Sequence, residues 1–165
     1  MSMIGNYRRV TPKELAALQQ RPETISTFLY PANIEAVPID RSLDIDKAWH
    51  AIHFLLNGEP WEGDLPLHNA VLGGTPLGEE DVGYGPARFL TPTEVAEVAR
   101  ALRGITPDEL RARFDPQRLA AANIYPSIWD DPDDALDYML INYQSLARFF
   151  QQAAQAGDAM LLYIN

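Results

Sequence analysis

The last third of the chain has apolar residues at helical spacing. They recur every three or four positions after Asp131-Pro132 and form one stripe, with Asn142, Gln144, Gln151 and Gln155 off it. The stripe consists of Leu136, Met139, Leu140, Tyr143, Ala147, Phe150 and Ala154. This pattern predicts one long helix over 132–156, ended by Gly157. The apolar run from Met160 to Ile164 then predicts a buried strand at the end of the chain.

A second helix is predicted between residues 45 and 56. Ile45, Trp49, Ile52 and Leu56 fall on one face at helical spacing, and Asn57-Gly58 follows as a stop signal. We expect this helix to start near Ser42 or Asp44.

Helix starts along the chain share one pattern, in which Thr or Asp precedes Pro. The side chain of Thr or Asp caps free amide groups, and Pro suits the first helical position because no N–H is needed there. The pairs are Thr11-Pro12, Thr91-Pro92, Thr106-Pro107, Asp115-Pro116 and Asp131-Pro132. After each of the three threonines, a Glu at the third position predicts a capping box.

Two further strands complete a small predicted sheet. Met3 to Val10 and Ala87 to Leu90 are the candidates, and we expect the N-terminal and C-terminal strands to lie in the same sheet. The segment from Glu59 to Pro86 lies between the helix that ends at Asn57-Gly58 and the helix that begins at Thr91-Pro92. It contains five glycines between residues 73 and 85 and shows no regular apolar pattern, which is typical of a functional loop. The predicted fold is α+β, with several helices packed around a small sheet in one domain spanning 1–165.

The charge and composition of the chain exclude several kinds of binding partner and of site. The 13 basic and 23 acidic residues give a net charge of −10, which disfavours nucleic acid and membrane surfaces. The absence of cysteine excludes disulfides and thiolate sites, and no apolar run reaches the length of a signal peptide or membrane span. We expect a cytoplasmic protein with no nucleic-acid or membrane partner.

The three histidines, His50, His53 and His68, lie within nineteen residues of one another. On one continuous helix, Asp46, His50 and His53 would share a flank, since their spacing is i, i+4 and i+7. A divalent metal is one interpretation; the other is an exposed Asp46–His50 pair with His53 hydrogen-bonded at the edge of the core. The order H-A-I-H does not match the metalloprotease motif, and the acidic cluster near Asp131 lacks the calcium-loop pattern. We therefore expect no metal and no cofactor.

The segment Gly83-Tyr84-Gly85-Pro86-Ala87-Arg88 places an aromatic ring and a guanidinium beside flexible backbone. Such a pair suits a planar or anionic ligand, and the alternative is a tight turn that leads into a strand. No serine lies in a nucleophile-elbow context, so the sequence offers no nucleophile.

Several of these segments, taken in order, resemble the YfbM-like family, a bacterial family of unknown function. The resemblance is carried by Met3-Ile4-Gly5, by Leu43 to His50 with His53-Phe54-Leu55, by Pro66-Leu67 with Ala70 to Gly73, by Gly83 to Arg88, and by Ile124-Tyr125-Pro126. It spans nearly the whole chain and implies a single α+β domain. It implies no reaction, cofactor or catalytic residue.

The leading hypothesis is a non-catalytic domain that binds a small molecule or a basic protein partner, one version being an immunity-type protein that masks a basic toxin. The alternative is a small hydrolase with a His/Asp/Arg site. The candidate ligand-binding residues are Asp46, His53, His68, Tyr84 and Arg88. We expect Tyr84 and Arg88 to approach the His53 side of the helix and to line one pocket with it, with Arg88 binding an anionic or carbonyl group.

Overall fold

The computed structural model describes residues 1–165 and has a five-stranded antiparallel sheet with the strand order β2-β1-β5-β4-β3. The strands are β1 (Gly5–Val10), β2 (Ser42–Asp44), β3 (Thr75–Asp81), β4 (Pro86–Leu90) and β5 (Ala159–Ile164). The N-terminal and C-terminal strands pair along their whole length, from Gly5 opposite Ile164 to Val10 opposite Ala159. The predicted α+β sheet that contains both terminal strands is confirmed.

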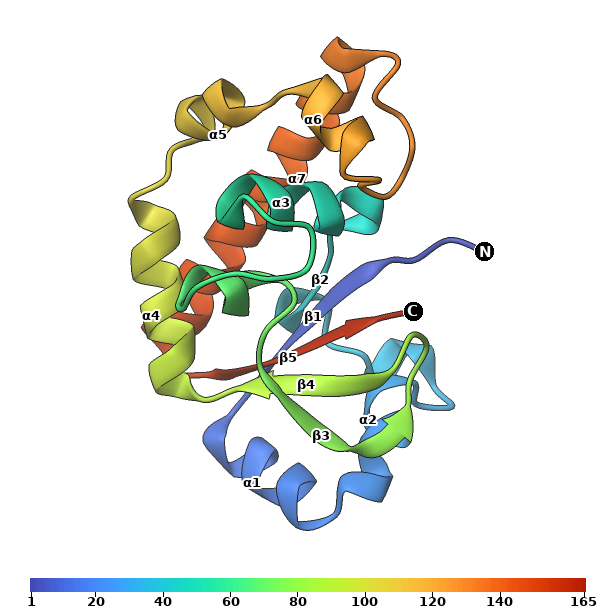
Figure 1. Ribbon diagram of the computed structural model, residues 1–165. Coiled ribbons are helices and arrows are strands. Elements are labelled where there is room, and N and C mark those ends of the chain that lie inside the picture. Colours follow the sequence, from blue (N-terminus) through green and yellow to red (C-terminus); the bar gives the residue numbers. More distant parts are fainter.

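Helices cover both faces of this sheet, as Figure 1 shows. Two of them, α1 (Pro12–Gln20) and α2 (Ile25–Leu29), lie on one face and enclose a core of 11 buried residues. The other face carries the larger core of 31 buried residues, so most of the apolar burial lies on that side. Its helices are α3 (Trp49–Asn57), α4 (Pro92–Arg103), α5 (Pro107–Arg113), α6 (Pro116–Ala121) and α7 (Pro132–Ala156).

The predicted terminal helix is confirmed, because α7 runs from Pro132 to Ala156 and ends at Gly157, whose φ is +71°. Met139, Leu140, Tyr143 and Phe150 of the predicted stripe are buried. Although α7 is the longest helix, neither it nor any other helix has the apolar length that crossing a membrane requires.

Capping follows the sequence pattern with two exceptions. Thr11 and Thr91 form complete capping boxes, and Asp115 accepts hydrogen bonds from two amides of its helix. The capping box predicted at Thr106 is only half formed: Thr106 accepts from the Glu109 amide, but the Glu109 carboxylate pairs with Arg113 instead. The side chain of Asp131 makes no capping bond at the start of α7.

Four elements depart from the sequence predictions. The segment read as an irregular loop contains β3, in which only Leu77 is buried, so the alternation that marks a strand is missing. Strand β2 has three residues, and α2 has five. The helix expected from Ser42 or Asp44 begins at Trp49, because Asp46 has a φ of +49° and no α-helix continues through that conformation.

Candidate functional site

The two histidines of α3 lie under the loop that follows this helix. His50 is 1% exposed; its Nδ1 accepts a hydrogen bond from the Tyr125 amide at 3.0 Å, so the ring proton resides on Nε2. Nε2 then donates to the Pro60 carbonyl at 2.9 Å. The ring stacks on Trp49 at a centroid distance of 4.9 Å and lies tilted against Trp61 at 4.4 Å. Burial lowers the pKa of His50, so this imidazole is neutral at physiological pH.

His53 has the same arrangement one turn later. It is 0% exposed; its Nε2 donates to the Glu62 carbonyl at 3.0 Å, and its Nδ1 accepts from the Asn57 amide group at 3.3 Å. Burial is the main reason why its pKa falls to about 4, and the nearby charges of His68, His50 and Arg88 lower it further. Both histidines therefore fasten the loop to α3 as neutral hydrogen-bond donors.

His68 is the one histidine whose ring nitrogens make no hydrogen bond. Its ring meets that of His53 edge-on at a centroid distance of 5.4 Å, and its buried Nδ1 has no hydrogen-bond partner. No group of three or more histidine and carboxylate side chains is arranged to hold a metal ion.

Arg88 approaches this cluster from β4, near enough for its charge to lower the His53 pKa. Its Nη1 donates to the carbonyl groups of Val71 and Gly73 at 3.1 Å and 2.7 Å, which ties the loop before β3 to the sheet. Burial lowers the pKa of the guanidinium, and Tyr7 partly offsets this effect. The structure thus brings together three of the candidate residues, His53, His68 and Arg88.

Asp46 and Tyr84 make their contacts elsewhere. The Asp46 carboxylate accepts a hydrogen bond at 2.8 Å from the hydroxyl of Tyr138 on α7. Since Asp46 precedes α3 and does not continue it, the prediction that Asp46, His50 and His53 share one helix flank is wrong, as is an exposed Asp46–His50 pair. Tyr84 is 45% exposed in the β3–β4 turn, where its amide donates to the Ile164 carbonyl at 2.9 Å. The ligand-binding role of these five residues stays a prediction.

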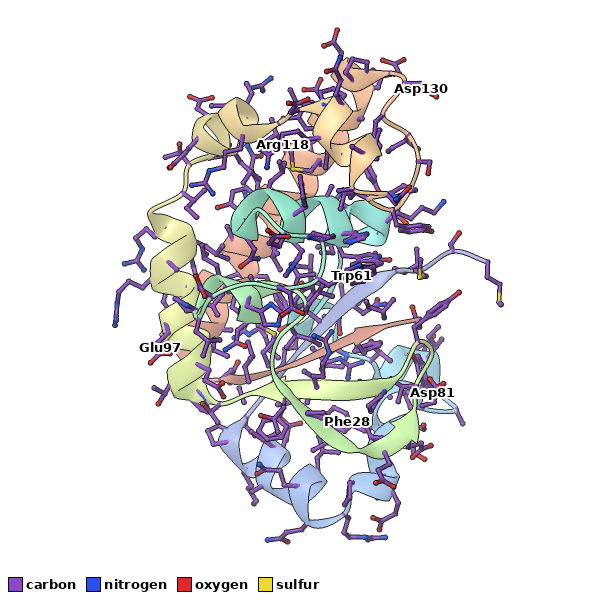
Figure 2. The ribbon with its side chains drawn as sticks, in the orientation of Figure 1. Phe28, Trp61, Asp81, Glu97, Arg118 and Asp130 are labelled. Carbon is purple, nitrogen blue, oxygen red and sulfur yellow. The ribbon has the colours of Figure 1, made fainter.

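A groove that the sequence analysis did not identify lies at the other end of the sheet. It has a volume of about 610 Å³ and is bordered by β2, β1, the end of β5 and the segment from Leu29 to Ile39. Arg8 pairs with Leu161 and Ser42, and Val10 and Leu161 belong to the core under α1 and α2, so the Arg8 side chain lies on that face. In Figure 2, Phe28 marks this side of the sheet and Trp61 the opposite side.

Large apolar side chains stand exposed around this groove. Ile39 is 90% exposed, Ile34 81% and Tyr30 44%, and all three line it. A second hollow of about 620 Å³, between α4, α5 and α7, is lined by none of the exposed large apolar side chains and is edged by Arg103, Arg148 and glutamines. Clustered exposed apolar residues around a concavity are typical of binding sites, so the groove near Ile34 is the better candidate.

Arg8 forms part of the groove wall and is only 3% exposed. Its Nε is buried without a hydrogen-bond partner, and it takes part in none of the ion pairs of the structure. The guanidinium carbon lies 5.5 Å from the centre of the Phe28 ring. Burial is the main reason why the pKa of Arg8 is lowered; the Tyr163 hydroxyl and the Glu14 carboxylate partly offset this effect, and the charge of Arg41 adds to it.

The sequence does carry a signal for Arg8. Arg8 and Arg9 are adjacent in a strand, and adjacent side chains point to opposite faces. If the strand is central and both faces of its sheet are covered, these arginine side chains become enclosed by protein. Whether Arg8 or Arg9 then lacks a carboxylate partner depends on segments that are distant in the sequence.

Comparison with known proteins agrees with this fold. Residues 1–163 match the family described as "Domain of unknown function (DUF1877)". Protein YfbM of Escherichia coli (strain K12) is 38% identical over 135 residues, which cover 78% of this chain and 75% of that protein. The crystal structure of YfbM, a protein of unknown function from Escherichia coli, superposes with a TM-score of 0.75 at 26% identity and covers 98% of this chain and 99% of that one. The chain therefore belongs to the DUF1877 family, as its resemblance to YfbM indicated.

Proposed function

We propose that this protein is a non-catalytic, cytoplasmic binding domain that takes up a small molecule in the groove between β2 and the segment from Leu29 to Ile39. The observation that carries the proposal is the set of exposed apolar side chains, Tyr30, Ile34 and Ile39, around a concavity of about 610 Å³. Pockets of this size and character enclose most of the surface of a small organic molecule.

The state of the histidines favours binding over hydrolysis. A general base needs a free ring nitrogen within reach of the proton that it removes. In His50 and His53 both ring nitrogens are engaged by backbone groups or by Asn57, and Arg88 donates to two carbonyl groups. His68 is the one histidine whose ring nitrogens make no hydrogen bond, so it is the only histidine that the alternative hydrolase hypothesis could use as a general base.

A basic protein partner, including the immunity-type version, is supported by the net charge of −10 alone. That charge is a property of the whole surface and selects no binding face. The groove is a defined concavity, so it supports a small-molecule ligand more directly.

Titration with a neutral apolar dye tests the proposal. We expect N-phenyl-1-naphthylamine to bind saturably with one site per chain, detected by its fluorescence increase. Replacing Ile34 and Ile39 together by Ser removes two exposed contacts and is expected to weaken binding at least tenfold, because burying an isoleucine contributes about 1.5–3 kcal/mol.

Ile141→Ser is the matched control, since Ile141 is 64% exposed on α7 and lies outside the groove. It is expected to leave dye affinity unchanged. Absence of saturable binding, or equal weakening by the control, would overturn the proposed function.

A further inference from the structure

We propose that the ligand of this groove is a small amphipathic carboxylate whose carboxyl group is bound by Arg8 and whose apolar body packs against Tyr30, Ile34 and Ile39. The inference rests on the proposed function and adds the chemical class of the ligand.

The first step concerns the missing counter-charge of Arg8. Two other arginines near this end of the sheet have carboxylate partners: Arg9 pairs with Asp158 at 2.9 Å and Arg41 with Glu14 at 3.1 Å. Arg8 has none, although it is more deeply buried than either. An arginine stays charged in proteins, and a buried charge without a partner is strongly unfavourable. The Glu14 carboxylate acts on Arg8 through its charge but is paired with Arg41, so the fold presents to the groove a buried cation that has no ion-pair contact of its own.

The second step concerns the charge of the ligand. Among the fourteen residues that line the groove, Arg8 is the only basic one and Asp44 the only acidic one; Asp44 is exposed, accepts a hydrogen bond from the Asp46 amide and forms no ion pair with Arg8. One guanidinium balances one negative charge, whereas a phosphate or diacid would carry an excess charge near Asp44 and within a protein of net charge −10. A guanidinium also matches a carboxylate in geometry, because its N–H groups donate in pairs. A monocarboxylate is therefore the anion that fits.

The third step concerns the remainder of the ligand. An apolar body of matching size would cover the exposed side chains that line the groove, which are Tyr30, Ile34 and Ile39. Tyr30 is itself held in place, since its hydroxyl donates to the Val82 carbonyl at 2.8 Å and its ring meets Tyr163 edge-on. An aryl or alkyl chain attached to the carboxylate satisfies both ends of the groove.

A matched series of three compounds tests the ligand class: 4-phenylbutyrate, its amide and 4-phenylbutylamine. They share a phenylpropyl body and differ in the head group, which is an anionic carboxylate, a neutral amide or a cationic ammonium. We expect the carboxylate to bind at least tenfold more tightly than the amide, and the amine to bind most weakly. In NMR spectra, the Arg8 Nε–H resonance is expected to shift on addition of 4-phenylbutyrate and to stay unchanged with the amine.

Arg8→Met is expected to reduce the affinity for 4-phenylbutyrate to that for the amide. Arg103→Met makes the same charge change on an exposed side chain outside the groove and is expected to leave the carboxylate preference intact. Should Arg8→Met not fold, the three compounds and the Arg8 resonance of the unmodified protein still decide the question.

Equal affinity for the carboxylate and the amide, with dye binding intact, would overturn this inference and leave the proposed function standing. A carboxylate preference that survives Arg8→Met would also overturn it, because Arg8 would then have a purely structural role. Loss of dye binding in the unmodified protein would overturn the proposed function, and the inference with it.

Discussion

At the scale of single residues, His53 shows how a side chain typical of active sites serves to hold a loop. Its two ring nitrogens bind the Glu62 carbonyl and the Asn57 amide, and the buried ring stays neutral. Protonation in this position would place a charge where burial and neighbouring Arg88 oppose it. The stability of the protein therefore depends on pH through this residue.

We predict that the free energy of unfolding decreases as pH falls from about 6.5 to about 4. The folded pKa of His53 is about 4, whereas an unfolded histidine has a pKa near 6.5, so the unfolded state binds the proton first. The contribution is fully present above about pH 6.5 and is lost toward pH 4, with a size on the order of 3 kcal/mol. Urea unfolding at a series of pH values measures it.

His53→Gln isolates this effect, because a glutamine amide retains a donor for the Glu62 carbonyl and does not titrate. The variant is expected to lose part of the decrease between pH 6.5 and 4, while the carboxylates contribute equally in both proteins. A pH profile identical to that of the unmodified protein would show that His53 does not carry the effect.

At the scale of elements, α7 determines whether the larger core forms. It packs against α4, α5 and the turn before α3, and it contributes eight buried residues to the fold. Neighbouring positions of this helix differ sharply in environment, since Leu140 is 5% exposed and Ile141 64% exposed. A charged side chain is therefore expected to destabilise the fold on the buried side of α7 and not on its exposed side.

We predict that Leu140→Asp unfolds the domain, because an unpaired buried carboxylate costs several kcal/mol, comparable to the total stability of a domain. Ile141→Asp, at the next position of the same helix, is expected to change the free energy of unfolding by no more than about 0.5 kcal/mol. Circular dichroism during thermal unfolding distinguishes the two. A cooperative transition of Leu140→Asp near the unmodified midpoint would contradict the burial of this face.

At the scale of the whole molecule, one sheet separates two cores. Strand β5 contributes Met160 and Leu162 to the core under α7 and contributes Leu161 and Tyr163 to the core under α1 and α2. Because the same strand serves both sides, loss of one core removes the support of the other. We expect the two layers to unfold together.

Leu18→Ala tests this coupling. Leu18 is 4% exposed in the smaller core, and its truncation is expected to lower the free energy of unfolding by about 2–5 kcal/mol. Trp49 and Trp129 belong to the larger core and Trp61 contacts Trp49, so tryptophan fluorescence reports on the far side of the sheet. Fluorescence and circular dichroism should shift by the same amount. An unchanged fluorescence midpoint would indicate that the α1–α2 layer unfolds alone.

Local signals in the sequence determined most of the helices and the terminal strands. Capping by Thr11, Thr91 and Asp115 and the stop at Gly157 act within a few residues, so they can be identified without the fold. The stripe of α7 is likewise a property of spacing. Strands β2 and β3 escaped prediction because one is three residues long and the other has a single buried residue.

The polar contacts were decided by the tertiary structure alone. Sequence proximity of His50, His53 and Asp46 suggested a site, yet His50 binds Tyr125 and Asp46 binds Tyr138, partners that are far away in the chain. The state of Arg8 has the same origin: pairing with β5 buries it, and the Glu14 carboxylate, whose charge acts on Arg8, is paired with Arg41. The spacing of apolar residues along the sequence predicts which face of a helix or strand is buried. The partner of a buried charged side chain, in contrast, depends on segments that only the folded chain brings together.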